Sequence, residues 1–401
     1  MANVSSSNGL EKRPKLRFPG FDEPYKQCRI GDIYAERSQR GASDMELLSV
    51  TMNDGVMPRS EIEGKDNSSE DKSNYKVVLT GDMVYNSMRM WQGANGISPC
   101  DGIVSPAYTV LMPKIPICNG YFAAFFKSPN LINEFRKNSQ GMTSDTWNLK
   151  YPQIETIKVC IPALSEQNRV ADMLGTLERR IAKQVQLVDS LKKYKRGVVR
   201  TLLTPDSCCI AGATWTTAKI GDLGSFTKGA PLSKADIAPD GTPFILYGEL
   251  YTTYHEVINS VIRRTKAQPE KQYYSHVGDV IIPTSGETPE EISTAACVML
   301  PDIILAGDLN IFRSSKIDGR IMSYILNHIV NGQIARIAQG KSVVHIQASE
   351  ISKIEISYPD YNTQCKMISV FETVGARIKS AENELTYLRS MQKALLQQLF
   401  I

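Results

Sequence analysis

The sequence predicts an α+β protein: two mixed α/β domains joined by two long antiparallel coiled-coil helices, with a pseudo-two-fold internal duplication. Three observations predict this class. The 401 residues exceed one typical hydrophobic core, so at least two domains are expected. Segments 161–204 and 358–401 align without a gap at a shift of 197 residues. Both place apolar residues three and four positions apart, which is the pattern of a helix seam.

The duplication divides the chain into four parts. A first globular domain is expected at 1–160 and a first long helix at 161–204. A second globular domain follows at 205–357, and a second long helix at 358–401. The order globular, helix, globular, helix therefore occurs as two copies of one plan.

The two expected helices share one seam pattern. Its apolar members are Leu174, Leu177, Ile181, Val188, Leu191, Val198, Leu202, Phe371, Val374, Ile378, Leu385, Leu388, Leu395 and Leu399. A lone seam of this length cannot bury its apolar stripe, so the two helices are expected to pack against each other. The polar seam positions Gln184, Lys195 and Gln392 are either markers of register and orientation or tolerated residues near a helix end.

A basic cluster lies in the first helix. It comprises Lys192, Lys193, Lys195, Arg196 and Arg200. Such a cluster could meet phosphate groups or a partner protein, and it is also typical of a solvated helix face.

The globular segments repeat more faintly. Gly31-Asp32 is echoed by Gly221-Asp222, and Gly81-Asp82 by Gly278-Asp279. Each pair is expected to be a turn that leads into an apolar strand.

Further elements follow in the same order in both halves. Short helices are expected at 121–126 and 324–329, and strands at 154–161 and 354–358, directly before the long helices. The polar stretch 61–73 is expected to be an exposed loop.

Composition excludes several classes of protein. With 42% hydrophobic and 22% charged residues, the chain is neither disordered nor fibrous. The net charge of +4 gives no global polybasic character. The start lacks a secretory pattern and no window has the length of a membrane helix, so a cytoplasmic location is expected.

Cysteine and histidine spacing predicts no metal site. The eight cysteines include no CxxC, and the four histidines form no HxxxH. The adjacent pair Cys208-Cys209 could bind a metal or form a vicinal disulfide, but reduced thiols are expected in an intracellular protein.

No catalytic constellation is found, so the chain is expected to be non-catalytic. Gly340-Lys341-Ser342 resembles the end of a phosphate-binding loop, but Ala335 occupies the position of the first glycine. The ExK spacing of Glu63-Gly64-Lys65 lies in the polar loop and lacks the upstream acid of a metal-dependent nuclease. No cofactor is expected to be bound by this chain.

Long hydrogen-bond donors in turn-rich, aromatic-flanked segments favour DNA recognition. Arg and Lys can bind guanine edges, Asn and Gln adenine edges, and Tyr and Ser phosphates. In the first domain the candidates are Arg37, Arg40, Arg59, Asn86, Arg89, Trp91 and Gln92. In the second they are Lys228, Lys234, Tyr247, Tyr251, Tyr254, His255, Ser285, Lys341 and Ser342, with Arg263 and Arg264 in the same set.

Three segments of the first expected long helix form a recognisable pattern: IPALSEQNR at 161–169, LKKYKRG at 191–197 and LLT at 202–204. They resemble the central helical region of type I restriction-modification specificity subunits, the HsdS family. The resemblance extends to 16–21, 81–93, 102–108, 227–234 and 278–286. The chain departs from the family at 358–364, where YPDYNTQ is a degenerate form of the Pro-x-x-x-Glu-Gln signature.

This resemblance implies a function in host defence through DNA methylation. The two globular domains would be target recognition domains, each reading one half of a bipartite, asymmetric site in double-stranded DNA. The helices would set the spacer and dock two adenine methyltransferase (modification) subunits, and restriction/translocase subunits would join the complex. S-adenosylmethionine, ATP and Mg would bind to the partner subunits, with no role for a membrane. The alternative is a non-catalytic coiled-coil scaffold with two protein- or ligand-binding domains.

Overall fold

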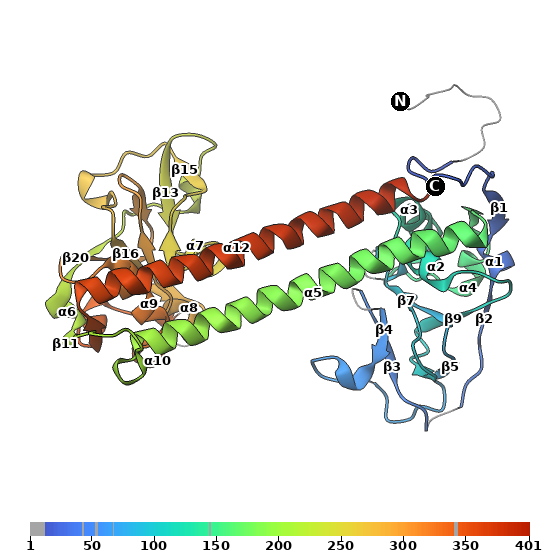
Figure 1. The fold of residues 1–401 in the computed structure, drawn as a ribbon, viewed down its shortest axis with the longest axis horizontal. Coiled ribbons are helices and arrows are strands. Elements are labelled where there is room, and N and C mark those ends of the chain that lie inside the picture. Colours follow the sequence, from blue (N-terminus) through green and yellow to red (C-terminus); the bar gives the residue numbers. More distant parts are fainter. Residues whose placement is uncertain (1–12, 42–43, 53–54, 67, 144–145, 341–343) are drawn as a thin grey trace. The chain divides into compact units, whose positions relative to one another are not determined.

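The computed structural model describes residues 13–41, 44–52, 55–66, 68–143, 146–340 and 344–401. Two compact units divide the chain: unit 1 is Met1–Val185 with Asn383–Ile401, and unit 2 is Gln186–Glu382. Two long helices, α5 (Leu164–Leu203) and α12 (Tyr361–Gln398), contribute residues to both units. Figure 1 shows the elements of each unit grouped around its own part of these helices.

Unit 1 is built on a four-stranded antiparallel sheet of order β2-β9-β6-β7. Strand pairs β1-β10, β3-β4 and β5-β8 complete its β-structure. The elements are β1 (Lys26–Arg29), α1 (Ile30–Ile33), β2 (Tyr34–Glu36), β3 (Leu48–Thr51), β4 (Gly55–Pro58), η1 (Arg59–Glu61), β5 (Lys76–Val78), β6 (Met83–Asn86), η2 (Met90–Gln92), β7 (Asn95–Ile97), β8 (Gly102–Val104), β9 (Tyr108–Pro113), α2 (Asn119–Phe125), α3 (Pro129–Asn138), α4 (Tyr151–Ile154) and β10 (Lys158–Ile161).

Unit 2 is built on a five-stranded sheet of order β12-β20-β16-β18-β14, beside a three-stranded sheet of order β15-β13-β19. Strand pairs β11-β22 and β17-β21 complete it. The elements are η3 (Pro205–Ser207), β11 (Trp215–Lys219), α6 (Ile220–Leu223), β12 (Gly224–Lys228), η4 (Lys234–Asp236), β13 (Thr242–Leu246), α7 (Glu249–Thr252), β14 (Val257–Ile258), β15 (Arg263–Thr265), η5 (Lys271–Tyr273), β16 (Asp279–Pro283), β17 (Ser285–Gly286), α8 (Pro289–Ile292), β18 (Ala296–Val298), β19 (Ile304–Ala306), β20 (Leu309–Ser314), α9 (Gly319–His328), α10 (Asn331–Ile337), β21 (Val344–His345), α11 (Ala348–Ile351) and β22 (Glu355–Pro359).

The two units repeat one plan. The β2-β9-β6-β7 order of unit 1 corresponds to β12-β20-β16-β18 in unit 2. In each unit an antiparallel pair, β1-β10 or β11-β22, ends directly before a long helix. The predicted fold class, two mixed α/β domains with two long helices and an internal duplication, is confirmed.

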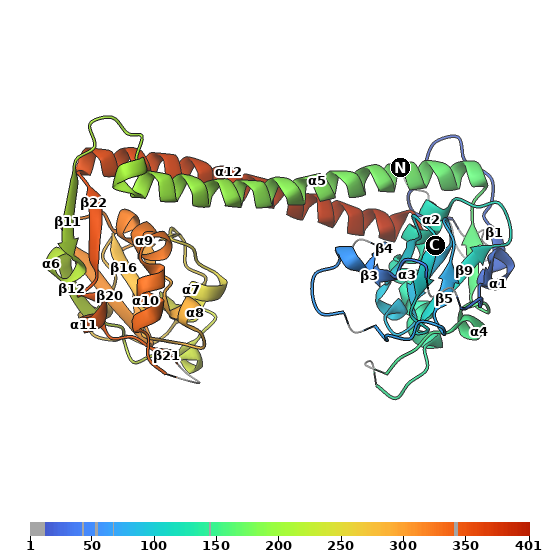
Figure 2. The same ribbon diagram turned by 90° about the horizontal axis from the view of Figure 1, so that it is seen from below.

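Within each unit the two long helices run antiparallel, as Figure 2 shows. In unit 1, Arg180 pairs with Glu384 at 2.7 Å, and Glu178 accepts a 3.5 Å hydrogen bond from Gln392. In unit 2, Lys192 pairs with Glu382 at 2.7 Å. Every expected seam residue is buried or half-buried, although Leu399 lies one residue beyond the end of α12.

The helix ends belong to the cores of the globular parts. In unit 1, Leu174 of α5 and Leu399 join the apolar cluster that contains α2. In unit 2, Leu202 at the end of α5 and Phe371 of α12 join the cluster around α9. Burying these ends in a large core stabilises the helices far more than their intrinsic propensity does.

A duplicated glutamine fixes the start of each long helix. Gln167 accepts a 3.0 Å bond from the backbone N–H of Cys118, before α2, and Gln364 accepts a 2.9 Å bond from that of Asp318, before α9. Each side-chain amide also donates to the carbonyl of the proline five residues earlier, at 2.9 and 2.8 Å. Both glutamines are buried, so one residue satisfies groups from two elements in each unit.

The degenerate signature of the second helix has a local explanation. In the first copy, Glu166 binds Arg17 at 2.9 and 2.8 Å and Tyr25 at 3.1 Å. In the second copy the equivalent residue is Thr363, whose hydroxyl donates to Asp360 at 2.7 Å. Asp360 also accepts the backbone N–H of Thr214 at 3.0 Å. The second helix therefore begins with a capping Asp that is linked to a preceding segment, in place of the ion pair between Glu166 and Arg17.

Two expectations about the repeated elements need correction. Gly31-Asp32 and Gly221-Asp222 do not form simple turns into strands: each lies in a single helical turn, α1 or α6, that precedes the strand. Ile154 ends helix α4, so the strand expected at 154–161 begins only at Lys158. Short apolar runs are compatible with a strand or with one helical turn, which explains both differences.

The other repeated turn is as predicted. Gly81 and Gly278 have φ values of +90° and +94°, which side chains rarely adopt. Each leads through an Asp into a central strand, β6 or β16.

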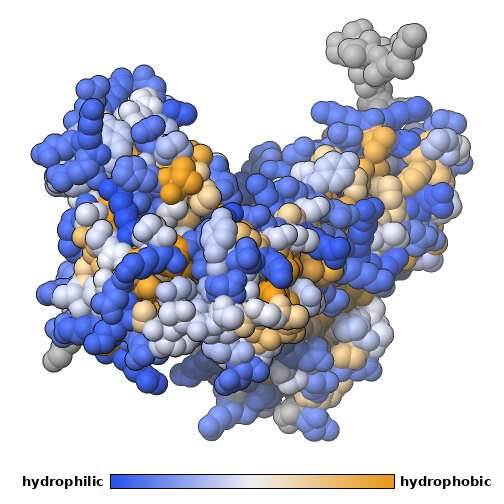
Figure 3. Space-filling view, turned by 60° about the vertical axis from the view of Figure 1, so that its left-hand side comes forward, coloured by the Kyte–Doolittle hydropathy of each residue, from blue (hydrophilic) through white to orange (hydrophobic). Residues whose placement is uncertain are grey.

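The face seen in Figure 3 is mainly hydrophilic with separate small hydrophobic patches. No helix within the described residues combines the length and apolarity needed to cross a membrane.

Candidate DNA interface

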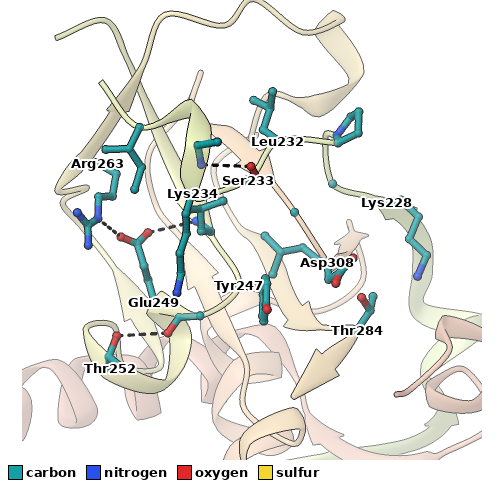
Figure 4. A pocket seen from close by; sticks show the side chains of 18 residues that line it. Lys228, Leu232, Ser233, Lys234, Tyr247, Glu249, Thr252, Arg263, Thr284 and Asp308 are labelled. Atoms are coloured by element: carbon teal, nitrogen blue, oxygen red, sulfur yellow. Dashed lines mark hydrogen bonds and ion pairs between the residues drawn. The ribbon is translucent and has the colours of Figure 1, made fainter. Parts of the chain in front are cut away.

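A pocket with a volume of about 1000 Å³ lies in unit 2 and is shown in Figure 4. Three predicted DNA-binding residues, Lys228, Lys234 and Tyr247, line it together with Arg263. They come from the end of β12, from η4, and from the segments that follow β13 and begin β15. The fold thus gathers donors that are up to 35 residues apart in sequence (228 against 263) around one concavity.

A buried carboxylate orients the arginine of this pocket. Glu249 has only 8% of its side chain exposed and accepts a 2.9 Å bond from Nε of Arg263, whose own side chain is 46% exposed. Its second oxygen accepts the backbone N–H of Leu246 at 3.2 Å. Because Nε is bound, the guanidinium is held in one orientation with its outer edge toward solvent, as phosphate or base recognition requires.

Lys228 approaches the opposite wall. Its Nζ donates to Oδ1 of Asn310 at 2.8 Å. Burial lowers the pKa of Lys228 below its ordinary value, and the nearby Asp308 carboxylate opposes that shift. Asp308 itself accepts a 2.9 Å bond from the hydroxyl of Ser285. A cation and a carboxylate on one wall can serve both acceptor and donor groups of a base edge.

The remaining second-domain candidates have more varied positions. Tyr251 donates to the carbonyl of Ser285 at 2.7 Å, and burial raises its pKa. The Tyr254 hydroxyl accepts the backbone N–H of Ile262 at 3.2 Å, so it supports a loop. His255 is exposed. Lys341 and Ser342 lie outside the described residues.

Four first-domain candidates gather in one turn between β6 and β7, which we call the reading turn (86–92). Asn86 shapes it by accepting the backbone N–H of Met88 at 3.0 Å. Arg89 and Gln92 are exposed. Trp91 packs edge-on against Trp147, with ring centroids 5.3 Å apart. The turn thus carries two exposed polar side chains close in sequence to a packed aromatic pair, a combination that suits base recognition.

The other three first-domain candidates bind protein groups. Arg40 donates to Asn74. Arg59 donates to the carbonyls of Ile62 and Lys65 at 2.6 and 2.7 Å, which organises the polar loop. Arg37 binds the buried carboxylate of Asp82 through Nε at 2.6 Å and Nη2 at 3.1 Å.

The contact of Arg37 with Asp82 has a counterpart in unit 2. Asp279, the repeat equivalent of Asp82, binds Arg313 at 2.9 and 3.0 Å. The two arginines come from different strands: Arg37 follows β2, whereas Arg313 lies in β20. Since the buried acid is repeated and its cation is supplied from different places, the pair serves the fold of each unit.

Replacement of Arg37 by alanine is therefore expected to lower the free energy of unfolding of unit 1 by about 2 kcal/mol, because Asp82 would lose its cation while buried. Replacement of the exposed Arg89 is expected to change it by less than about 0.5 kcal/mol. Urea unfolding followed by tryptophan fluorescence measures both. Equal effects of the two substitutions would contradict the structural role of Arg37.

Sequence reasoning missed the acids of this interface. Glu249 and Asp308 are not among the residues predicted from the sequence, because only hydrogen-bond donors are expected there to contact DNA. A carboxylate three residues from the apolar strand 242–246, or directly after Gly307 with its φ of +75°, is a signal that could have been noticed. Within the described residues no group of three or more metal-ligating side chains occurs.

A protein-family model and solved structures are similar to this chain. Residues 213–388 match the sequence model of the type I restriction modification DNA specificity domain. In fold, the chain is similar to the S subunit of a type I restriction-modification system from M. genitalium, with 13% identity, 97% of this chain and 99% of that chain covered, and a TM-score of 0.59. It is also similar to a chain solved in work on complex assembly and conformational transition of the type I system, with 14% identity, 95% and 98% covered, and a TM-score of 0.60.

The match covers the segment that carries the pocket of unit 2, and the similarity in fold extends over nearly the whole chain. Residues 213–388 are therefore similar to a type I restriction modification DNA specificity domain, and nearly the whole chain shares the fold of the two solved structures.

Proposed function

We propose that each unit reads one half of a bipartite, asymmetric DNA site, and that the long helices set the distance between the halves. The observation that carries this proposal is the repeated plan: both units have the same central strand order and the same glutamine at the start of a long helix. Two copies of one recognition fold in a single chain call for two half-sites.

The proposed site is asymmetric because the two copies present different side chains. Unit 1 offers Arg89 and Gln92 in the reading turn, whereas unit 2 offers Lys228, Lys234 and Arg263 around a pocket. Different donors in the two units select different bases. The scaffold alternative, two ligand-binding domains on a coiled coil, is not favoured by the specificity-domain match.

The partners proposed for this chain are two adenine methyltransferase subunits and, in the full complex, restriction/translocase subunits. This chain would contribute recognition and spacing, while methyl transfer and cleavage would take place on the partners. S-adenosylmethionine, ATP and Mg would bind there. We place the complex in the cytoplasm, where the host DNA lies. The exposed polar faces of α5 and α12 are available for the methyltransferase subunits.

The experiment that tests this function exchanges residues 205–357 for the matching segment of a relative. The hybrid and the parent chain are each coexpressed with the methyltransferase subunit, and modified adenines are mapped by single-molecule sequencing. We expect the second half-site to change and the first half-site and the spacer length to stay the same.

The reciprocal exchange of 1–160 is the matched control and should change only the other half-site. A methylated sequence unaltered by either exchange, with methylation still present, would contradict half-site recognition by the units. Changes in both half-sites after a single exchange would contradict their independence.

A further inference from the structure

A basic groove in unit 1 lies next to the reading turn but includes none of its residues. It has a volume of about 350 Å³ and lies between α3 and the last part of α12. The described residues that line it are Lys127, Pro129, Ile132, Asn133, Arg136, Arg389, Gln392, Lys393 and Leu396. Four of these nine carry a positive charge and none is acidic.

The cations of this basic groove are held in place from two sides. Arg389 and Lys393 are four residues apart on α12, so they lie on one face of the helix. On the other side, Arg136 of α3 has its guanidinium 5.6 Å from the centre of the Trp91 ring and donates to the Trp91 carbonyl at 3.4 Å. The basic groove is thus joined to the reading turn through a single tryptophan.

The internal duplication shows which charges are neutralised. At the shift of 197, Arg389 corresponds to Lys192, which forms a 2.7 Å ion pair with Glu382 in unit 2. The position equivalent to Glu382 is Val185, so no carboxylate is available to Arg389 there. The repeat thus gives Arg389 no counterpart of the carboxylate that pairs with Lys192.

Repeat-equivalent residues one helical turn further along also differ in charge pairing. Lys195 is paired with Glu256, whereas its equivalent, Gln392, is neutral and donates to Glu178 at 3.5 Å. No ion pair involves Arg389, Lys393 or Lys127 among the described residues. Clustered cations repel one another and raise the energy of the empty groove, which an anion would relieve.

Resting on the proposed function, we propose that this basic groove holds phosphates of the DNA backbone beside the half-site read by the reading turn. The C-terminal long helix is then a DNA-contacting element as well as a spacer. Phosphate oxygens suit the groove because Arg and Lys donate to them in many geometries. The contact fixes the DNA strand relative to Arg89 and Gln92 and carries no base preference of its own.

The test uses the complete chain assembled with its methyltransferase subunits and a duplex that carries the mapped site. The double variant Arg389→Gln with Lys393→Gln removes two charges from the basic groove. Lys366→Gln with Lys379→Gln removes two charges from exposed positions of the same helix and is the matched control. Arg136 is left intact because it supports Trp91.

Fluorescence anisotropy across a salt series measures the affinity. The groove variant should bind at least about tenfold more weakly at about 0.1 M salt, and its log–log salt slope should be shallower by about 1 to 2. The control variant should match the parent protein. The methylated sequence should be the same for all three, because phosphate contacts carry no sequence information.

Duplexes in which single phosphates are replaced by neutral methylphosphonates test which phosphate the basic groove contacts. Neutralising one phosphate beside the half-site of unit 1 should weaken binding by the parent complex but have little further effect on the groove variant. Urea unfolding followed by the fluorescence of Trp91 and Trp147 serves as the folding control. A midpoint equal to that of the parent protein would show that unit 1 of the groove variant is folded.

Three outcomes separate the possibilities. Parent-like affinity and slope in the groove variant would overturn the proposal. Loss of assembly with the methyltransferase subunit, at concentrations where the control assembles, would overturn it in favour of an acidic protein partner. A parent complex that binds no duplex specifically would instead refute the proposed function.

Discussion

Replacement of Glu256 by alanine is expected to lower the free energy of unfolding of unit 2 by about 3–5 kcal/mol. The carboxylate lies between Nζ of Lys195, at 2.7 Å on α5, and Nε2 of His328, at 2.8 Å on the last residue of α9. The three side chains are only 13–19% exposed. Without Glu256, the Lys195 ammonium would be left desolvated beside the Tyr324 ring, 5.4 Å from its centre.

The same site gives a pH dependence of stability. Burial alone would raise the pKa of Glu256, but the hydrogen bonds and charges of His328 and Lys195 outweigh burial and lower the pKa to about 2. Since the ordinary pKa is 4.5, the folded form binds the proton less well than the unfolded chain. The stabilisation is therefore complete above about pH 5 and is lost as the pH falls from about 4.5 toward 2, with a size on the order of 3 kcal/mol.

A Glu256→Gln variant should show this window directly. Its side chain is neutral at every pH, so the difference in stability from the parent protein should be largest near neutral pH. The two proteins should converge as the pH is lowered. A difference that stays constant down to about pH 3 would contradict the lowered pKa of Glu256.

Tryptophan placement allows the measurement to be made on unit 2 alone. Of the three tryptophans, only Trp215 lies in unit 2, where it packs against the core. Urea unfolding in a Trp91→Phe, Trp147→Phe background therefore reports on this unit. The matched control is Glu350→Ala, which breaks an exposed pair with Lys353 and should cost at most about 0.5 kcal/mol. A Glu256→Ala effect no larger than that of the control would contradict the prediction.

Lys195 shows which features could be predicted from the sequence and which could not. The long helices could be predicted because a seam repeats over some 40 residues in two copies, and a periodic pattern of that length seldom arises outside a long helix. The partner of Lys195 could not be predicted, because Glu256 lies in a loop 61 residues later with no periodic pattern. In the seam pattern Lys195 is either a register marker or a tolerated polar residue, whereas the structure pairs it with Glu256 in the globular part of unit 2.

The grouping of the candidate DNA-binding residues could be predicted only where these residues are close in sequence. Asn86, Arg89, Trp91 and Gln92 fall in one turn, so their grouping survives folding. Arg37 has the same residue type and a similar setting, yet its partner is a buried carboxylate. A donor looks alike in sequence whether it meets protein or phosphate, and only the packing distinguishes the two.

Replacement of Phe400 by alanine is expected to lower the free energy of unfolding of unit 1 by about 3–5 kcal/mol. This penultimate residue follows α12 and is only 3% exposed. Its ring stacks on Phe125 of α2, with centroids 5.2 Å apart and planes at 25°, and meets Tyr121 edge-on at the same distance. The alanine variant would leave a cavity in a core of aromatic side chains that cannot easily collapse.

Urea unfolding in a Trp215→Phe background measures this effect, because Trp91 and Trp147 then report on unit 1 alone. Tyr387→Ala is the matched control: Tyr387 is an aromatic residue of α12 in the same unit, but it is 66% exposed. It should change the stability by less than about 0.5 kcal/mol. If the two variants unfolded at the same urea concentration, Phe400 would contribute no more to the stability of unit 1 than an exposed residue does. The predicted difference would instead show that the second long helix is anchored in unit 1 by the aromatic core.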